Sequence, residues 1–479
     1  MILLLSGPLT APGQSGPMTA GNPDVRVIIG TFLGNDQRNY YGNEAPSSLN
    51  IIWKHYLGQG TTVISRKSGS RIWAGAGWTG QPLLVEEDGV LFLIQGAYDH
   101  HLKKINAATG ELVWQYLFDD VVKGTGTIWE NKNAEQTDDR YIILQGSRLG
   151  IGNFLDTRHI PSYRAISYLT GRELWRLDVS WTDSYSRDVD ASALIIRDTV
   201  YIGLENALFT VFDPDPAKAV LKDSMLQPRV IQQIRLYEKK DIAAHNYNLV
   251  TESSPSLLGD MIYLASGSGH IYGYSLVSRR LVWDFYTGSD MDGSAVITSD
   301  SCILASIEKQ YIAGNGGAIK LDPARPPAEA VIWYFPTGDK EYGSWQGGII
   351  GSIGINDSYD PEIHRNLAAF AAIDGYLYVV DHTLIDSTTT VTGMDGTTKY
   401  PCPKLIFKDY TGPSISTPIF TGNRLVMAGY QGLRIYEYDN SLNFKLLDHF
   451  QASFEATPVC YNGKIYIASR NGYLYCFGD

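Results

Sequence analysis

The sequence predicts an all-β fold, a single eight-bladed β-propeller built from four-stranded antiparallel blades. One repeat shows the pattern: an apolar strand at 90–94, a polar turn, a strand at 102–106, a Thr109-Gly110 turn and a strand ending at Trp114. Outer strands of this kind recur along the chain, and their large apolar residues are Trp53, Trp114, Trp175, Ile234, Trp283, Trp333, Phe407 and Leu447. Eight such repeats predict eight sheets arranged in a ring.

The N-terminal part differs from the repeats. We expect residues 1–48 to form a leader or extension and residues 49–479 to form the propeller. Residues 6–24 are rich in Gly, Pro, Ser and Thr, which is typical of a flexible segment. The apolar run at 2–5 is too short to span a membrane and has no basic segment before it, so we expect no transmembrane segment. It is compatible with the remnant of a signal peptide.

The last repeat, residues 454–479, supplies only three strands before the chain stops. Its missing outer strand is predicted to be the segment 49–55, which carries Trp53. Pairing these two ends of the chain closes the ring and leaves no free sheet edge.

Charge and cysteine content exclude several classes of protein. The net charge is −12, and no cluster of lysine or arginine marks a surface for nucleic acid or anionic lipid. The four cysteines form neither a CxxC motif nor an adjacent pair, so neither a zinc ribbon nor a thioredoxin motif is present. We expect a monomer with no nucleic-acid partner.

A specific motif occurs at residues 106–114, Asn-Ala-Ala-Thr-Gly-Glu-Leu-Val-Trp, with weaker copies at 167–175 and 275–283. It resembles the "ALDAxTGxxxW" signature of pyrroloquinoline-quinone-like (PQQ-like) propeller repeats. That family includes quinoprotein dehydrogenases and the propeller lipoprotein of outer-membrane assembly. The resemblance therefore implies the architecture, but it leaves both enzymes and binding scaffolds open.

In such a propeller, the loops that precede the inner strands share one face with the loops between the second and third strands. This rule selects the polar and aromatic residues that surround the central channel. The candidate ligand-binding residues are Trp78, Gln81, Tyr98, His100, His101, Arg158, His159, Tyr163, Arg187, His245, Tyr247 and Trp345.

Three groups among these residues suggest different chemistry. Trp78 and Trp345 lie in glycine-rich segments and could stack on a sugar or a planar cofactor, or could simply plug the channel mouth. The His100-His101 pair could supply a base or a metal ligand, or could be ordinary loop residues. The long insertion 146–163 brings Arg158, His159 and Tyr163, which suit an acidic ligand such as a uronate; the alternative is a surface lid with solvated charges.

Five carboxylates come from three consecutive predicted blades: Asp188, Asp190, Glu252, Asp290 and Asp292. They could converge on a hard cation, and calcium is the candidate because it prefers oxygen ligands. The alternative is that these side chains cap backbone amides in turns.

The sequence supports three functions and leaves open whether the protein is an enzyme. We favour a ligand-binding propeller, periplasmic or extracellular, with a polar and aromatic funnel for a glycan or a protein. The first alternative is a quinoprotein dehydrogenase that depends on PQQ and calcium. The chain is short for that group and lacks the adjacent cysteine pair of many such enzymes and a CxxCH haem site. The second is a carbohydrate-active enzyme such as a polysaccharide lyase.

Overall fold

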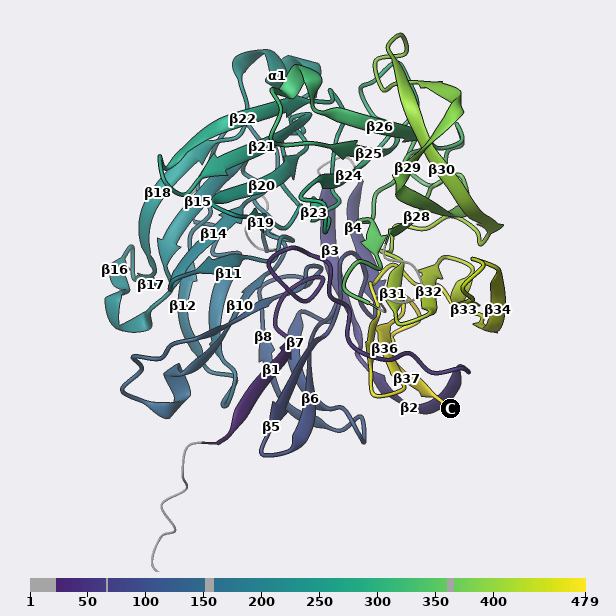
Figure 1. Cartoon of the computed structure of the whole chain (residues 1–479). Helices are drawn as coiled ribbons and strands as arrows, with labels where there is room; N and C mark the ends of the chain where they lie inside the picture. The colour runs from purple at the N-terminus through teal and green to yellow at the C-terminus, as the bar shows by residue number, and fades with distance from the viewer. Residues whose placement is uncertain (1–22, 66–67, 151–158, 360–365) are drawn as a thin grey trace, which may run out of the picture.

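Eight antiparallel sheets surround a central channel in the computed structural model, which describes residues 23–65, 68–150, 159–359 and 366–479 (Figure 1). Seven sheets have four strands, and the first has a fifth strand at its inner edge. The predicted eight-bladed propeller is therefore confirmed. Among the described residues, no helix is long and apolar enough to span a membrane.

The blades are numbered in chain order, and each is given from its inner to its outer strand. They are blade 1, β5 (Leu83–Glu87), β6 (Val90–Gly96), β7 (His101–Asn106) and β8 (Leu112–Leu117); blade 2, β9 (Thr127–Glu130), β10 (Tyr141–Gly146), β11 (Tyr163–Ser167) and β12 (Glu173–Leu177); blade 3, β13 (Leu194–Ile196), β14 (Thr199–Gly203), β15 (Leu208–Asp213) and β18 (Arg229–Arg235); blade 4, β19 (Ser256–Leu258), β20 (Met261–Ser266), β21 (His270–Ser275) and β22 (Arg280–Tyr286); blade 5, β23 (Val296–Ile297), β24 (Ile303–Ile307), β25 (Gly317–Leu321) and β26 (Val331–Pro336); blade 6, β27 (Gly354–Ile355), β28 (Leu367–Ala371), β29 (Tyr376–Thr392) and β30 (Lys399–Tyr410); blade 7, β31 (Ile419–Thr421), β32 (Arg424–Gly429), β33 (Gly432–Tyr438) and β34 (Phe444–Phe450); and blade 8, β35 (Val459–Tyr461), β36 (Lys464–Ala468), β37 (Tyr473–Gly478) and β2 (Asn50–Tyr56).

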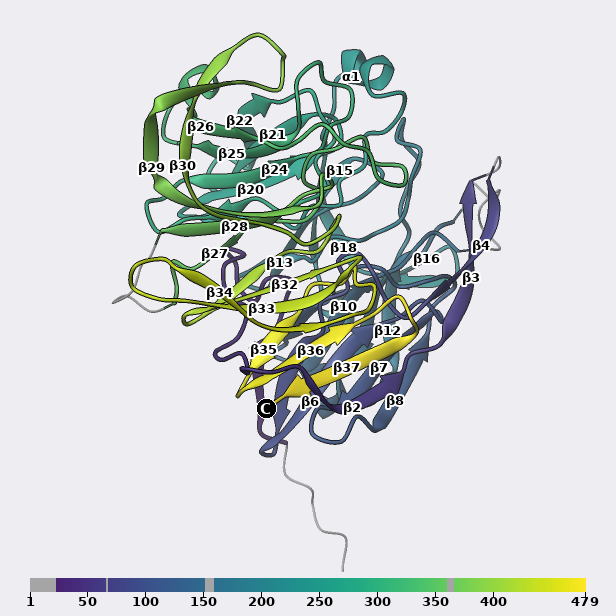
Figure 2. The same ribbon diagram turned by 90° about the vertical axis from the view of Figure 1, so that its right-hand side faces the viewer.

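Short elements decorate this ring. Two hairpins, β3 (Gln59–Ser65) with β4 (Gly69–Ala74) and β16 (Val220–Lys222) with β17 (Met225–Gln227), form separate two-stranded sheets. Figure 2 shows β3 and β4 extending away from the ring, and the long β29–β30 hairpin standing out on another side. Among the residues that the structure describes, the helical elements are α1 (Lys239–Ala244) and three 3-10 turns, Thr137–Asp139, Pro216–Lys218 and Pro327–Glu329.

The burial of each strand follows its place in the blade. Every residue of β10, β24 and β28 is buried, since these strands are covered by neighbouring blades on both faces. In the outer strand β8 the side chains alternate between exposed and partly buried. Alternation with a period of two is the pattern that a half-buried strand requires.

The tryptophans of five outer strands each join their blade to the next one. The indole N–H of Trp53 donates to Ala107 O at 3.0 Å, and that of Trp114 donates to Tyr168 O at 3.0 Å. The remaining three do the same: Trp175 to Pro214 O at 2.8 Å, Trp283 to Arg325 O at 3.1 Å and Trp333 to His382 O at 2.9 Å. Each acceptor belongs to the third strand of the following blade or to the turn after it.

The glycine of the Thr-Gly turn makes room for the indole. Gly110 has φ of +76°, and a Cβ there would lie 2.7 Å from Cε3 of Trp53 in blade 8. Gly171, in the equivalent turn of blade 2, faces Trp114 in the same way. In blade 1, the glycine therefore contacts the tryptophan of the preceding blade, and the tryptophan contacts the glycine of the following blade.

The two ends of the chain close the ring as predicted. The N-terminal strand β2 pairs antiparallel with β37, with Asn50 opposite Gly478 and Tyr56 opposite Tyr473. Blade 8 thus takes three strands from the C-terminus and its outer strand from the N-terminal part of the chain.

The segment before β2 fills the channel. β1 (Val25–Ile29) pairs with β5 inside blade 1, and the following residues receive backbone hydrogen bonds from the inner strands of blades 2, 4, 5 and 8. Arg38 is fully buried there and donates to Pro255 O at 2.7 Å and to Phe32 O at 2.9 Å. Residues 1–22 of the predicted leader lie outside the described residues.

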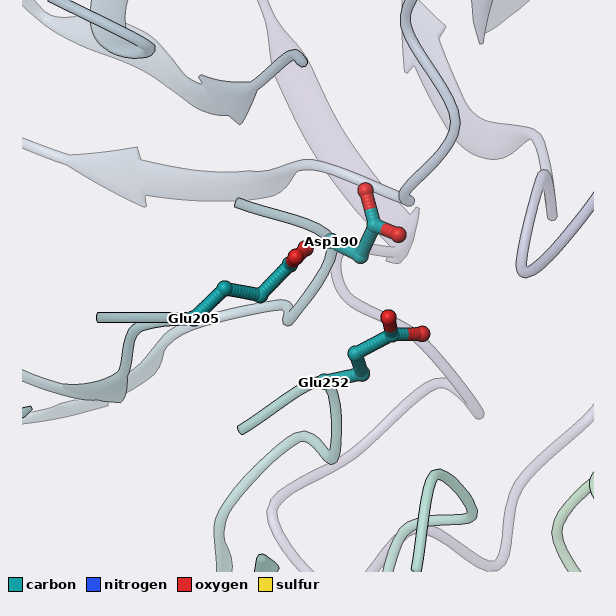
Figure 3. Close-up of side chains that lie close together, drawn as sticks. All are labelled: Asp190, Glu205 and Glu252. Atoms are coloured by element: carbon teal, nitrogen blue, oxygen red, sulfur yellow. The ribbon is translucent and has the colours of Figure 1, made fainter. Parts of the chain in front are cut away.

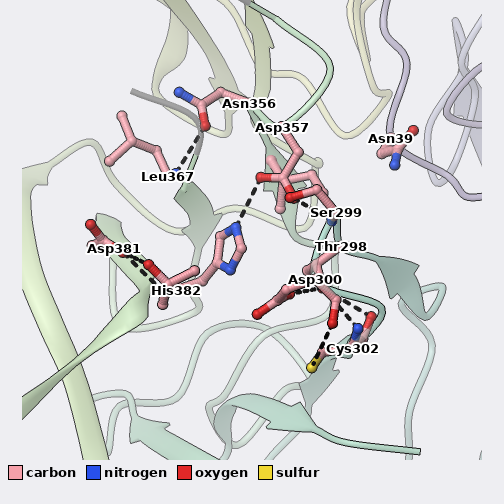
Figure 4. Close-up of polar contacts among 12 residues, drawn as sticks. Asn39, Thr298, Ser299, Asp300, Cys302, Asn356, Asp357, Leu367, Asp381 and His382 are labelled. Carbon is pink, nitrogen blue, oxygen red and sulfur yellow. Dashed lines mark hydrogen bonds and ion pairs between the residues drawn. The ribbon is translucent and has the colours of Figure 1, made fainter. Parts of the chain in front are cut away.

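A further set of polar contacts joins blades 5 and 6. It lies on the face of the ring that carries the turns between the first and second strands of each blade. The buried His382 lies 2.9 Å from Asp357 through Nε2 (Figure 4). Its Nδ1 lies 3.1 Å from the ammonium of Lys320, which also donates to Asp300 at 2.6 Å. Lys320 is a protonated donor, so Nδ1 accepts and Nε2–H donates to Asp357.

Replacing Gly110 with alanine tests the inter-blade contact. The change brings both left-handed backbone strain and a clash with Trp53, so we expect a loss of roughly 2–5 kcal/mol in the free energy of unfolding. Gly89→Ala is the matched control, because Gly89 has φ of +78° but nothing within 4 Å of a Cβ. Chemical denaturation should show a much larger loss for Gly110→Ala, and equal losses would contradict the account.

Candidate functional site

The predicted face carries a cavity of about 320 Å³ at the mouth of the channel. We call this cavity the funnel. Its lining comes from loops of several blades and from β4: Trp73, Trp78, Tyr98, Lys123, Glu252, Asp292, Ser344, Trp345, Ile350, Ile415, Glu455 and Arg470. The segment that fills the channel lies beneath it, since Leu33 N donates to Oε1 of Gln81, whose Nε2 donates to Pro458 O.

Aromatic rings form much of the funnel wall. Trp78 packs with Ile350 and Ile415, and its indole N–H donates to Oε2 of Glu252 at 3.1 Å. Trp345 packs against the same apolar group and is only partly buried. These contacts hold the two indoles at the cavity before any ligand arrives.

Trp73 and Tyr98 also line the funnel, and the centres of their rings are 5.1 Å apart. The guanidinium of Arg470 lies over both rings, 4.8 Å from the centre of Tyr98 and 5.7 Å from that of Trp73. A Cβ on Gly77 would come within 2.0 Å of the Tyr98 hydroxyl, so the glycine lets the two loops approach closely.

Both cations of the funnel are already paired. Lys123 forms an ion pair with Asp190, and Arg470 lies 2.7 Å from Oε2 of Glu455. Burial lowers the pKa of Lys123, but the carboxylates of Asp190, Glu252 and Glu205 outweigh it, so that the net pKa is raised well above its usual value.

Three carboxylates approach one another beside the funnel, as Figure 3 shows. One oxygen each of Asp190, Glu205 and Glu252 lies within 4.8 Å of the others. We call these three residues the carboxylate cluster. Ser186 donates to Oε2 of the buried Glu205 at 2.6 Å, whereas Oε1 has no hydrogen-bond partner among the described residues. Burial raises the pKa of Asp190 to about 7 and that of Glu205 well above its usual value.

Further carboxyl groups come from blade 5. Asp290 is buried and accepts a hydrogen bond of 2.6 Å from Asn248. Burial, with the charge of Glu252 nearby, raises the pKa of Asp290 to about 7. Burial and the charges of Asp290 and Glu252 raise the pKa of Glu308 to about 9. Burial also raises the pKa of Asp292. The raised pKa values favour the protonated, neutral form of all three groups, of which only Asp292 lines the funnel.

Some of the site residues predicted from the sequence lie together at the funnel or in the carboxylate cluster. Trp78, Tyr98, Trp345, Glu252 and Asp292 line the funnel. Asp190 joins Glu252 in the carboxylate cluster.

Two more of the predicted acidic residues have protein partners near the funnel. Asp188 binds Arg148 at 2.8 Å, and Asp290 is held by Asn248. Whether any of the five binds a metal stays a prediction.

The other predicted residues do not line the funnel. His100 lies 2.9 Å from Thr61 O of the β3–β4 hairpin, His101 contacts Asp99, and His159 lies 3.2 Å from Asp178. The remaining ones are placed as follows: Gln81 is buried below the funnel, Tyr163 packs with Trp175 and Phe212 in the core, Arg187 lies 3.9 Å from the Trp181 ring, His245 is buried against Tyr311, and Tyr247 is exposed. Arg158 lies outside the described residues.

Several residues of the site could not be selected from the sequence. Lys123, Glu205, Glu455 and Arg470 lie in loops of the predicted face, but only the packing of blades shows which ones meet. Trp73 comes from the β3–β4 hairpin, a segment with no counterpart in the repeat.

The fold and the funnel together define an eight-bladed β-propeller with a polar and aromatic cavity on its loop face. Residues 58–244 match the family model described as outer membrane protein assembly factor BamB, which confirms the resemblance over that part of the chain. No curated protein sequence matches the chain.

Two solved structures share the fold. BamB from Moraxella catarrhalis aligns with a TM-score of 0.52 and 11% identity, covering 90% of this chain and 100% of that one. Quinohemoprotein alcohol dehydrogenase from Comamonas testosteroni aligns with a TM-score of 0.56 and 13% identity, covering 94% of this chain and 80% of that one. At such low identity the likeness concerns the fold alone.

The residues present do not fit a quinone held by calcium. The carboxylate cluster offers oxygen ligands, but the ammonium of Lys123 is already paired with Asp190 there. PQQ is itself a tricarboxylate, and Glu252, Asp292 and Glu455 would face it in the funnel. We therefore derive no step through this cofactor.

The raised pKa values predict how stability depends on pH. The carboxyls of Asp290 and Glu308 lose their protons near pH 4 in the unfolded chain but only near 7 and 9 in the folded protein. The folded state binds more protons between these limits, so the free energy of unfolding falls as the pH rises. Thermal unfolding should show a lower midpoint in alkaline buffer than in mildly acidic buffer.

Asp290→Asn should reduce this dependence, and Asp395→Asn is the control. Hydrogen bonds from Thr398 and Thr397 lower the pKa of the exposed Asp395 to about 2, so it does not titrate in this window. A midpoint that rises with pH, or an equal effect of both variants, would contradict the burial of these acids.

Lys123→Met tests the role of the internal ammonium. Without it, the carboxylate cluster keeps three oxygen ligands and loses its cation, so we expect calcium binding at least tenfold tighter than in the wild type. Titration calorimetry with calcium, supported by the calcium-dependent shift in melting temperature, measures the change. Calcium binding by the wild type that is as tight as that of the variant would show that Lys123 does not take the place of a metal.

Proposed function

We propose that this chain is a ligand-binding propeller that acts outside the cytoplasm and holds a glycan in the funnel. The observation that carries the proposal is that three indoles, Trp73, Trp78 and Trp345, line one cavity together with the acidic side chains of Glu252, Asp292 and Glu455. Indole faces suit the apolar faces of sugar rings, and carboxylates accept hydrogen bonds from sugar hydroxyls. A cavity of about 320 Å³ is at the small end of ligand pockets.

Pre-organisation of the aromatic wall supports binding. Glu252 fixes the edge of Trp78, and Ile350 and Ile415 pack against the ring, so the indole loses little freedom when a ligand stacks on it. The loops themselves are anchored on inner strands that the N-terminal segment holds together.

The arrangement gives no comparable support to a lyase. Such an enzyme needs a base and a cation around a uronate. His159 is bound to Asp178 and Tyr163 is in the core of blade 2, so neither faces the funnel.

A protein ligand is the second candidate. It is favoured by the match of residues 58–244 to the model of an outer membrane protein assembly factor, which also supports the proposed location. The same face would then serve as the docking surface.

Substitution of the indoles tests the proposal. Trp78→Ala and Trp345→Ala should each weaken glycan binding about tenfold, the equivalent of roughly 1.4 kcal/mol of lost stacking. Ligands are first identified on a glycan array and then measured by titration calorimetry. Trp181→Ala is the matched control, because this exposed indole stacks on Arg187 and does not line the funnel. Absence of glycan binding, or binding unaffected by both funnel variants, would contradict the proposal.

A further inference from the structure

We infer that the glycan of the funnel is a chain of several neutral sugar residues, which leaves the cavity over Trp345 and places a further sugar ring on Tyr342. The inference rests on the proposed glycan-binding function and specifies the class of ligand. It follows from aromatic rings that continue from the funnel wall to the protein surface. We call Trp345, Tyr430 and Tyr342 the aromatic row.

The face that carries the funnel also carries the exposed aromatic side chains of the described residues. They lie in loops of this face or at the ends of outer strands that reach it: Tyr56, Trp181, Tyr185, Tyr247, Tyr286, Tyr311, Tyr342 and Tyr410. Aromatic rings that gather on one face of a soluble protein are typical of a binding surface. Among them, Tyr342 is linked to the funnel by ring contacts.

The aromatic row runs outward from the funnel wall. Trp345 lines the cavity, and its ring centre lies 6.4 Å from that of Tyr430. The ring centre of Tyr430 lies 4.9 Å from that of Tyr342, which is 39% exposed. Tyr430 packs against the same apolar group as Trp78, and its hydroxyl donates to Oε1 of Glu455 at 3.0 Å. The middle of the row is therefore fixed to the funnel wall.

A tight turn fixes the two ends of the row relative to each other. Tyr342 N donates to Trp345 O at 3.0 Å, and Trp345 N donates to Tyr342 O at 3.1 Å. Gly343 takes the first central position of this two-residue turn with φ of +62°, a conformation that favours glycine. The backbone that carries both rings is thus held in place before a ligand binds, which lowers the entropy lost on binding.

The turn suits a sugar chain better than a peptide. An extended peptide commonly binds by adding a strand to free backbone groups. Those of Tyr342 and Trp345 are already bonded to each other. A sugar chain needs ring faces for stacking and side chains that bond to its hydroxyls. Glu341, Ser344 and Gln346 are exposed in and beside the turn and supply such side chains.

The size and charge of the funnel favour a neutral chain over a single sugar or a uronate. A cavity of about 320 Å³ is at the small end of ligand pockets, so it encloses only a short part of a glycan. A single sugar would occupy the funnel and leave Tyr342 in water. Lys123 is already paired with Asp190 and Arg470 with Glu455, so a uronate would have to compete with these acids.

The test measures how affinity depends on chain length. The probes are oligomers of glucose, mannose and N-acetylglucosamine with two to six residues, measured by titration calorimetry. We expect at least one series to bind, with the hexasaccharide about tenfold tighter than the disaccharide. Tyr342→Ala should weaken hexasaccharide binding about tenfold and leave disaccharide binding unchanged. Tyr342→Phe, which keeps the ring, should bind like the wild type.

Tyr56→Ala is the matched control, because Tyr56 is exposed and packs on Tyr473, which does not line the funnel. It should bind short and long oligomers like the wild type. Unchanged melting temperatures show that the variants are folded.

The outcomes separate this inference from the proposed function. Equal binding of short and long oligomers, lost in Trp78→Ala, would overturn the chain and leave glycan binding in the funnel in place. A length effect that Tyr342→Ala does not reduce, or that Tyr56→Ala reduces equally, would overturn the route over Tyr342. Absence of binding by all three series would overturn the inference. Another glycan found on the array, with binding lost in Trp78→Ala and Trp345→Ala, would still support the proposed function.

Discussion

The hydrogen bond from an outer-strand indole to a carbonyl of the next blade is the contact that recurs most regularly around the ring, at five of its eight junctions. A single bond of this kind contributes only about 1 kcal/mol, but each also docks a large ring onto the neighbouring blade. Trp53 makes this contact across the point where the chain closes, from blade 8 to blade 1. The loops that form the funnel come from different blades, so their relative positions are set by these contacts.

The N-terminal part of the chain gives the ring a second constraint. It supplies the outer strand of blade 8, and before that it lies along the inner strands with the guanidinium of Arg38 bound to backbone oxygens. Burial lowers the pKa of this guanidinium to about 10, yet it remains charged at neutral pH. The channel is thus closed below the funnel, and the site is a cavity with a floor. A scaffold held at so many points can tolerate buried carboxyls such as Glu205 and Asp290, which themselves oppose stability.

The fold was predictable because its determinants are local in sequence. Strand alternation and a large apolar residue in the outer strand recur in each repeat, two repeats add the Thr-Gly turn, and the incomplete last repeat indicated the closing strand. The structure adds the reason for the motif, since Gly110 makes room for Trp53 of another blade.

The site was only partly predictable, because its contacts join loops far apart in sequence. The topology rule placed Trp78, Tyr98 and Trp345 at the funnel correctly. Gln81 satisfied the same rule, but its side chain is taken up by Leu33 of a segment that the sequence assigned to the leader. The pairing of Lys123 with Asp190 joins two loops of different blades, so no pattern within one repeat could reveal it. The central claim is that the funnel is the binding site, and a crystal structure with a bound oligosaccharide found on the glycan array tests it most directly. We expect a sugar ring against Trp78 or Trp345, and a ligand bound elsewhere with the funnel empty would contradict the claim.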